Sequence, residues 1–276
     1  MDVSLDYELK YQQVKKYLGK RQDSFTQAID FKNDINKRQS FYSELFLAAA
    51  LQKCIGKEAR LMEQTGENHP DVVMKMNRVR FNFEVTLMTQ EDERFQYKSI
   101  NAKEHAVTDK PKTQLTSKIL DKIKQYERWF KKGIVNKNDV NIIAVDLGDF
   151  FPSTPIPGVT LLDAAIFMMS DEYEIHIDNY GSKCQLSPSR GFLVKTGRDG
   201  RESNIHLDHI YDGLKHIDAL LTFTKINALE SSNNFDIINI KNNENVNRLF
   251  SLISPHYQTK ISHCGILWED TMANVE

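Results

Sequence analysis

Two carboxylates stand close together in the segment HPDVVMKMNRVRFNFEVTL, residues 69–87. The run of apolar residues predicts a β-hairpin, with Asp71 at the start of the first strand and Glu84 late in the second. Asn77 and Arg78 mark the turn between them. An acidic residue inside an apolar strand costs free energy unless an opposite charge pairs with it. A divalent cation held between the two carboxylates would meet this cost, and many enzymes cut phosphodiesters at such a site.

The second strand of the hairpin alternates in side-chain character from Val79 onward. By strand parity, its apolar residues share one face and its polar residues share the other. The apolar face holds Val79, Phe81, Phe83, Val85 and Leu87, and the polar face holds Arg80, Asn82, Glu84 and Thr86. If the polar face were open to water, Glu84 would simply be solvated; a covered face would require a partner for it.

A helix precedes the hairpin. Residues 41–55 have helical periodicity, which places Glu44 on the same face as Phe41, Ala48, Leu51 and Ile55. Two interpretations of Glu44 stay open. It curls from the helix edge to solvent or to a lysine, or it points toward the same site as Asp71 and Glu84.

A second helix follows the hairpin. Residues 88–116 are polar and irregular and predict a long loop. Residues 117–132 predict a helix with an apolar stripe and a mixed flank about a quarter-turn away. The stripe consists of Ile119, Ile123, Tyr126 and Phe130, and the flank consists of Lys118, Lys122, Gln125 and Trp129. The apolar run 141–147 then predicts a buried strand, so that strand, helix and strand form a crossover.

The later sequence predicts further helices and strands around the same core. Helices are expected over 159–170 and 244–253, and strands over 173–177, 191–195, 216–224 and 235–240. The expected fold class is α/β, with a central mixed β-sheet flanked by helices. Residues 1–40 are expected to be a helical N-terminal extension. Residues 41–276 form one domain, with its core over about 41–150 and elaborations over 151–276.

This order of elements resembles the PD-(D/E)XK nuclease superfamily, which has the restriction-endonuclease-like fold. The matching features are a helix with an inward Glu44, Pro70-Asp71 opening a strand, Glu84-Val85-Thr86 on the next strand, and a helix bearing Lys122 and Gln125. The Asn-rich stretch 239–247 is in keeping with larger members. One departure matters: Thr86 stands where the family pattern has lysine.

The resemblance implies a metal-dependent endonuclease that hydrolyses phosphodiester bonds in DNA. Asp71, Glu84 and the backbone carbonyl of Val85 would hold Mg²⁺ or Mn²⁺. Glu44 would assist as an outer carboxylate, and Gln125 would position water or a ligand. Because a threonine hydroxyl carries no positive charge, another lysine must replace the missing one. Lys122 is the first choice and Lys75, on the face of Asp71, is the second.

The alternative is a nucleic-acid-binding or assembly module on the same fold that has lost catalysis through Thr86. In a third reading, the chain is an unrelated α/β interaction protein whose hairpin acids are solvated. Basic residues on the central helix, including Lys118, Lys124 and Arg128, would track the phosphate backbone of DNA, or of RNA, unless they form an ordinary solvated face. The resemblance also allows a homodimer, because cutting two strands needs two sites.

The composition of the chain limits the functional classes to which it can belong. The 276 residues carry a net charge of −2, so nucleic-acid binding would require a local basic patch. No apolar run is long enough to cross a membrane, and three widely separated cysteines fit a reducing compartment, so a cytoplasmic protein without a membrane partner is expected. Glycine-rich nucleotide-binding motifs are absent. The histidines of 206–216 have spacing that would allow a metal site, which we rank below the carboxylate site.

Overall fold

The computed structural model describes the parts of the chain that form a central sheet and the helices on it. The described residues are 35–56, 59–61, 69–88, 109–147, 162, 166, 173–178, 181–186, 192–196, 201–206, 210, 212–223, 235–253 and 259–260. The predicted N-terminal extension lies outside them except for its last six residues, which belong to the first described helix. The predicted helix over 159–170 is described only at positions 162 and 166, both helical.

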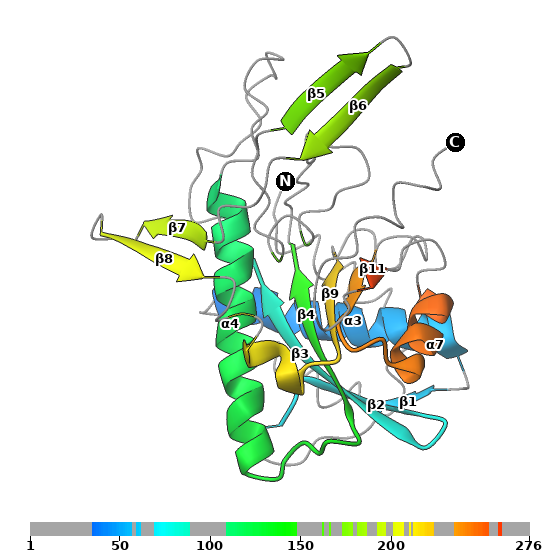
Figure 1. Ribbon diagram of the computed structural model, residues 1–276. Helices are drawn as coiled ribbons and strands as arrows, with labels where there is room; N and C mark the ends of the chain where they lie inside the picture. Colours follow the sequence, from blue (N-terminus) through cyan, green and yellow to red (C-terminus); the bar gives the residue numbers. More distant parts are fainter. Residues whose placement is uncertain are drawn as a thin grey trace, which may run out of the picture.

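The sheet is mixed and contains seven strands in the order β1-β2-β3-β4-β9-β10-β11. Five strands form its body, and the short β1 and β11 lie at the two edges (Figure 1). The pairs β1/β2, β2/β3 and β9/β10 are antiparallel, whereas β3/β4, β4/β9 and β10/β11 are parallel. The strands are β1 (Ala59–Leu61), β2 (Val72–Met76), β3 (Val79–Leu87), β4 (Val140–Asp146), β9 (Ala219–Phe223), β10 (Asp236–Asn239) and β11 (Thr259–Lys260).

Helices cover both faces of this sheet, and each face has its own core. Helices α3 (Ile35–Ile55) and α7 (Glu244–Ile253) pack on one face, and helix α4 (Asp109–Lys131) packs on the other with the 3₁₀ helix η4 (Leu214–His216) (Figure 1). Along β3, Phe81, Phe83 and Val85 belong to the α3 core. The predicted α/β fold with a mixed sheet flanked by helices is therefore confirmed.

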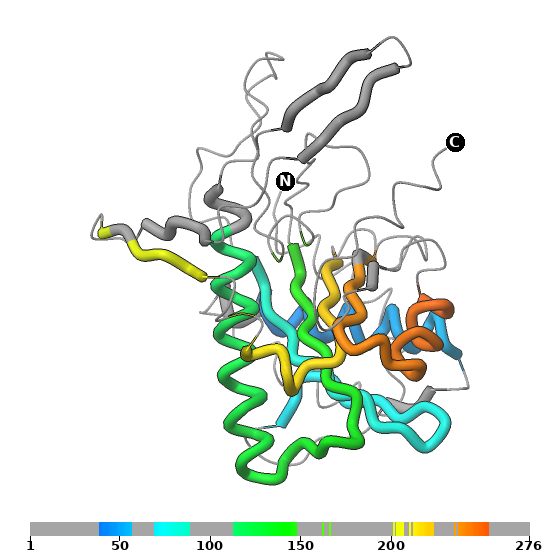
Figure 2. The backbone as a smooth tube through the Cα atoms, viewed as in Figure 1, coloured from blue at the N-terminus to red at the C-terminus, as the bar shows by residue number. Residues whose placement is uncertain are grey.

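The hairpin β2–β3 turns where the sequence predicts it. Met76 pairs with Val79, leaving a two-residue turn at Asn77 and Arg78. Both turn residues have positive φ, 50° and 70°, as a type I′ turn requires. Figure 2 shows the hairpin as a continuous cyan tube that leads into the centre of the sheet.

Several predicted boundaries differ from the structure. Helix α4 begins at Asp109, so residues 109–116 are helical and the expected loop over 88–116 is wrong there; Pro111 lies in the first turn, where a missing N–H is tolerated. Trp129, expected on the mixed flank, is buried and packs edge-on against Tyr126, with ring centroids 5.3 Å apart. The buried arc of α4 is wider than its stripe because η4 and the chain after the helix also cover it.

Two small hairpins lie outside the central sheet. Strands β5 (Tyr173–Asp178) and β6 (Gly181–Leu186) form one, and β7 (Phe192–Thr196) and β8 (Glu202–His206) form the other. The strands over 173–177 and 191–195 are thus confirmed to within one residue, whereas their partners were not predicted. Within the described part of the chain, no helix has both the length and the apolar character needed to cross a bilayer.

Candidate active site

The polar face of β3 is not open to water, because α4 lies over it. Asn82, Glu84 and Thr86 are all buried, and Glu84 is only 1% exposed. The interpretation of Glu84 as a solvated strand residue is therefore wrong. A carboxylate in this position needs partners, and the structure supplies them from two other elements.

Lys122 of α4 is the cationic partner of Glu84. Its Nζ donates a hydrogen bond to Glu84 Oε1 at 2.6 Å, and its side chain is 19% exposed. Burial alone would lower the pKa of Lys122, but Glu84, Asp71 and Glu44 outweigh it, so the pKa is raised and the amine stays charged. The structure thus places a lysine beside Glu84 from a helix 38 residues further along the chain.

Asp71, just before β2, is the second group that acts on Glu84. Its Oδ2 accepts a hydrogen bond of 2.7 Å from the backbone N–H of Val85, which fixes the carboxyl group beside β3. Asp71 and Glu84 are close enough to share a proton. Burial, and then the neighbouring Asp71 charge, raise the pKa of Glu84 to about 8. Burial also raises the pKa of Asp71, although Lys122 and the Val85 N–H oppose the shift.

Glu44 belongs to the same electrostatic cluster. Burial raises its pKa well above the ordinary value, and the charges of Asp71 and Glu84 raise it further, while Lys122 lowers it. Glu44 is half-buried, and the charges that act on it are those of Asp71, Glu84 and Lys122, so both the hairpin acids and a lysine are near it. Three acids therefore share one lysine, so the cluster is short of positive charge.

A bound cation would offset the excess of negative charge in this cluster. Glu84 Oε2 is buried and receives no hydrogen bond from an N–H or O–H group of the described residues, and loss of the proton that Glu84 shares with Asp71 would leave it available to a cation. Carboxylate oxygens are the donors that Mg²⁺ and Mn²⁺ prefer. No three His, Cys, Asp or Glu side chains of the described residues form a ready-made ligand cluster, so Asp71 and Glu84 would be completed by backbone oxygen and water. The residues fit a hard cation with few protein ligands.

The remaining predicted site residues are spread along α4 and β2. Gln125 and Lys118 are partly exposed on α4, whereas Lys124 and Arg128 are fully exposed there. Lys75 is also exposed; it pairs with Arg80 near the hairpin turn and is not among the charges that act on Glu84. The structure therefore favours Lys122 over Lys75 as the lysine of the cluster.

Tyr126 was not identified from the sequence as a residue that positions α4, and with it Lys122, on the sheet. It is fully buried, and its hydroxyl hydrogen-bonds to the carbonyl oxygens of Asn82 at 2.7 Å and Ile142 at 3.0 Å. These two contacts hold α4 against β3 and β4 at a point one helical turn after Lys122. A tyrosine on an apolar stripe is normally buried for packing, so only the pair of facing carbonyls reveals this second role.

The histidines of 206–216 do not form a described metal site. His206 is exposed on β8, and the His216 ring stacks on Phe130 with centroids 4.4 Å apart. His209 lies outside the described residues. No protein-family model, no curated protein and no solved structure matches this chain.

Proposed function

We propose that this protein is a metal-dependent endonuclease of restriction-endonuclease-like fold that hydrolyses phosphodiester bonds in DNA. The main support for this proposal is that Asp71, Glu84 and Lys122 lie together. Lys122 Nζ is 2.6 Å from Glu84 Oε1, and Asp71 accepts a hydrogen bond from the backbone N–H of Val85. The order α3, β2, β3, α4, β4 is also the order of elements on which the resemblance rests, with the short β1 added before the hairpin. Lys122 supplies from α4 the positive charge that Thr86 lacks.

The roles follow from the chemistry of these groups. Asp71 and Glu84, with the carbonyl of Val85, would hold Mg²⁺ or Mn²⁺, and the bound cation would polarise the scissile phosphate and activate a water. Lys122, already charged and desolvated, stabilises negative charge that builds on the phosphate. Glu44 adds a third carboxylate, and Gln125 lies on the same helix as Lys122 to orient water or substrate.

One observation favours the second candidate, a nucleic-acid-binding module without catalysis. Lys122 already neutralises Glu84, and an ion pair of this kind also serves as a purely structural contact. In that case the chain binds nucleic acid but does not cut it, and binding does not need metal.

The deciding experiment combines melting temperature with plasmid cleavage, in EDTA, Mg²⁺ and Mn²⁺. We expect metal to raise the melting temperature of the wild type, because a ligand that binds only the native state stabilises it. Asp71→Ala should lose the metal shift and should lower the cleavage rate by at least the roughly 10–100-fold that removal of an outer-shell partner of a metal ligand costs. Lys75→Ala, which removes an exposed lysine of the same hairpin, is the matched control. Metal-dependent cleavage by Asp71→Ala at the wild-type rate would refute the proposal.

A further inference from the structure

A basic surface lies at the C-terminal end of α4, away from the acid cluster. The exposed side chains there are mostly basic and come from α4, the turn after it and η4: Lys124, Arg128, Lys131, Lys132, Lys137 and Lys215. Among the exposed residues of these elements the acids are Asp121, at the far end of the surface, and Asp212, just before η4. Positive charge therefore predominates on this side of a chain whose net charge is −2.

Part of this surface comes from η4, which packs closely against α4. A Cβ at Gly213 would collide with the side chain of Ile123, so the chain approaches α4 as closely as only glycine allows. Leu214 and Ile217, one and four positions after Gly213, are buried in the α4 core. Lys215, between them in the chain, is exposed, and it belongs to η4, which contacts α4.

An aromatic pair lies in the middle of this basic surface. Phe130 and His216 are both partly exposed and stack with ring centroids 4.4 Å apart and planes 23° from parallel. Burial lowers the pKa of His216, and the charges of Lys215, Lys241 and Lys131 lower it further, while Glu127 opposes the shift. A neutral, stacked imidazole surrounded by lysines suits a planar base next to a phosphate.

We propose that the part of this surface around Lys131, Lys215 and the Phe130–His216 stack binds a nucleic-acid strand outside the cleavage site. Lysines contact phosphates, and the aromatic pair contacts a base. The proposal rests on the proposed function for the nature of the ligand. Nine residues separate Lys122 from Lys131, which is about 14 Å along the helix axis, so a strand that reaches both would span a few nucleotides.

The test is fluorescence anisotropy of a labelled 20-nucleotide single strand and its duplex over a range of salt concentrations, in EDTA so that no strand is cut. The variant is Lys131→Gln/Lys215→Gln. The control is Lys53→Gln/Lys75→Gln, which removes the same charge from exposed sites on α3 and β2. We expect the variant to weaken single-strand binding roughly tenfold and to lower the salt slope by about 2, with less than a twofold change in the control.

His216→Gln removes the ring from a partly exposed position. It should weaken single-strand binding more than duplex binding, because only unpaired bases offer a face for stacking. Equal losses in the two lysine pairs, unchanged binding in the Lys131/Lys215 variant, or no binding by the wild type would each overturn the inference. These outcomes are distinct from failure of the proposed nuclease, which would show as absent cleavage and absent metal stabilisation while anisotropy is unaffected.

Discussion

The balance of charge around Glu84 is the central feature at the scale of single residues. Lys122 donates to one carboxylate oxygen of Glu84, and the other oxygen receives no hydrogen bond from an N–H or O–H group of the described residues. The threonine at position 86 lies on the same face but brings no charge. Glu84 therefore depends on Lys122, and on any bound cation, for its ionised form.

Replacing Lys122 by methionine tests this dependence. The variant leaves a buried carboxylate without its cation, so we expect a loss of about 1–3 kcal/mol in the free energy of unfolding at pH 8. At pH 5 the loss should be smaller, because a protonated Glu84 needs no cation. Urea unfolding at both pH values measures the effect. Adding Glu84→Gln to Lys122→Met should recover most of the stability; an equal loss at both pH values would contradict the ion pair.

A pH dependence follows from the raised pKa of Glu84. In the folded protein Glu84 titrates at about 8 instead of 4.5, so between these values the folded state holds a proton that the unfolded state releases. As far as this group is concerned, the stability of the metal-free protein should therefore be constant at and below about pH 4.5 and should fall as the pH rises from there to about 8. Melting temperatures in EDTA should fall less steeply for Glu84→Gln; parallel curves would exclude this assignment.

At the scale of elements, the position of Lys122 depends on how α4 sits on the sheet. Tyr126, one turn further on, bonds to carbonyls of β3 and β4 and so fixes both the rotation and the height of the helix. We expect Tyr126→Phe to cost about 1–2 kcal/mol of stability, because two buried carbonyls lose a donor while the packing is kept. Chemical denaturation measures the loss. A change below a few tenths of a kcal/mol would mean that the carbonyls are satisfied without the hydroxyl.

Elements with a strong local pattern were predictable from the sequence. The hairpin turn at Asn77 and Arg78 is confirmed, and helix 244–253 is confirmed residue for residue, because alternation and helical periodicity are local signals. Trp129 was misplaced because it belongs to a core that contains residues from distant parts of the chain, which the helical period of α4 alone does not show. The convergence of Lys122 on Glu84 was a hypothesis from the resemblance; no local pattern specifies a contact between a helix and a strand so far apart.

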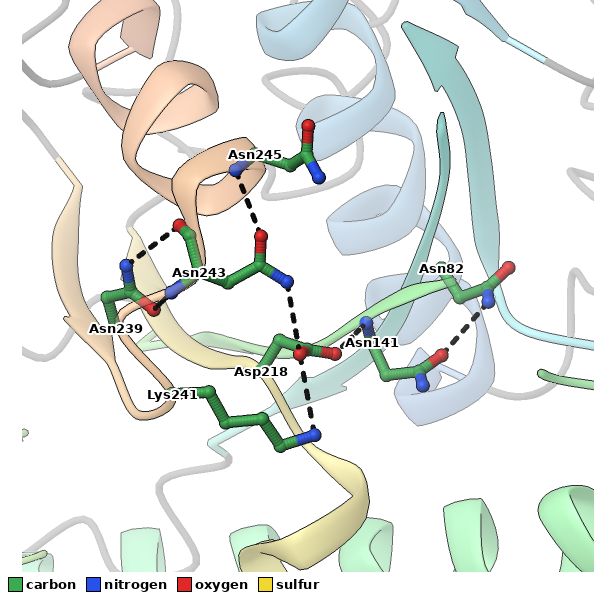
Figure 3. Close-up of polar contacts among 7 residues, drawn as sticks. All are labelled: Asn82, Asn141, Asp218, Asn239, Lys241, Asn243 and Asn245. Atoms are coloured by element: carbon green, nitrogen blue, oxygen red, sulfur yellow. Dashed lines mark hydrogen bonds and ion pairs between the residues drawn. The ribbon is translucent and has the colours of Figure 1, made fainter. Parts of the chain in front are cut away.

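At the scale of the whole molecule, a row of buried polar side chains joins the early and late parts of the chain. Asn82 donates to Asn141, whose backbone N–H donates to Asp218 Oδ2 at 2.8 Å (Figure 3). Asp218 Oδ1 in turn accepts from Asn243 and pairs with Lys241, each at 3.4 Å. The row crosses β3, β4 and the start of β9 and reaches the loop before α7, so the late elements are tied to the strands of the candidate site.

Asp218→Ala should therefore destabilise the whole fold and not one edge of it. Removing this buried acceptor leaves the Asn141 N–H and the Asn243 amide without their partner, and we expect a loss of about 2–4 kcal/mol. Lys241→Ala removes only the partly exposed ion pair with Asp218. It should lower the free energy of unfolding by less than about 1 kcal/mol. Urea unfolding monitored by both fluorescence and circular dichroism should give one common transition. Two separate transitions would show that the late elements unfold on their own.

The placement of Lys122 on a helix has a consequence for the order of assembly. The hairpin β2–β3 closes through contacts near in sequence, which form fast, but closing it brings Asp71 and Glu84 together before any cation is present. Repulsion between the two acids opposes closure of the hairpin until α4 packs on the sheet and Lys122 pairs with Glu84. Hairpin and helix must consequently form together in the rate-limiting step at neutral pH, and acid should speed folding by removing the repulsion.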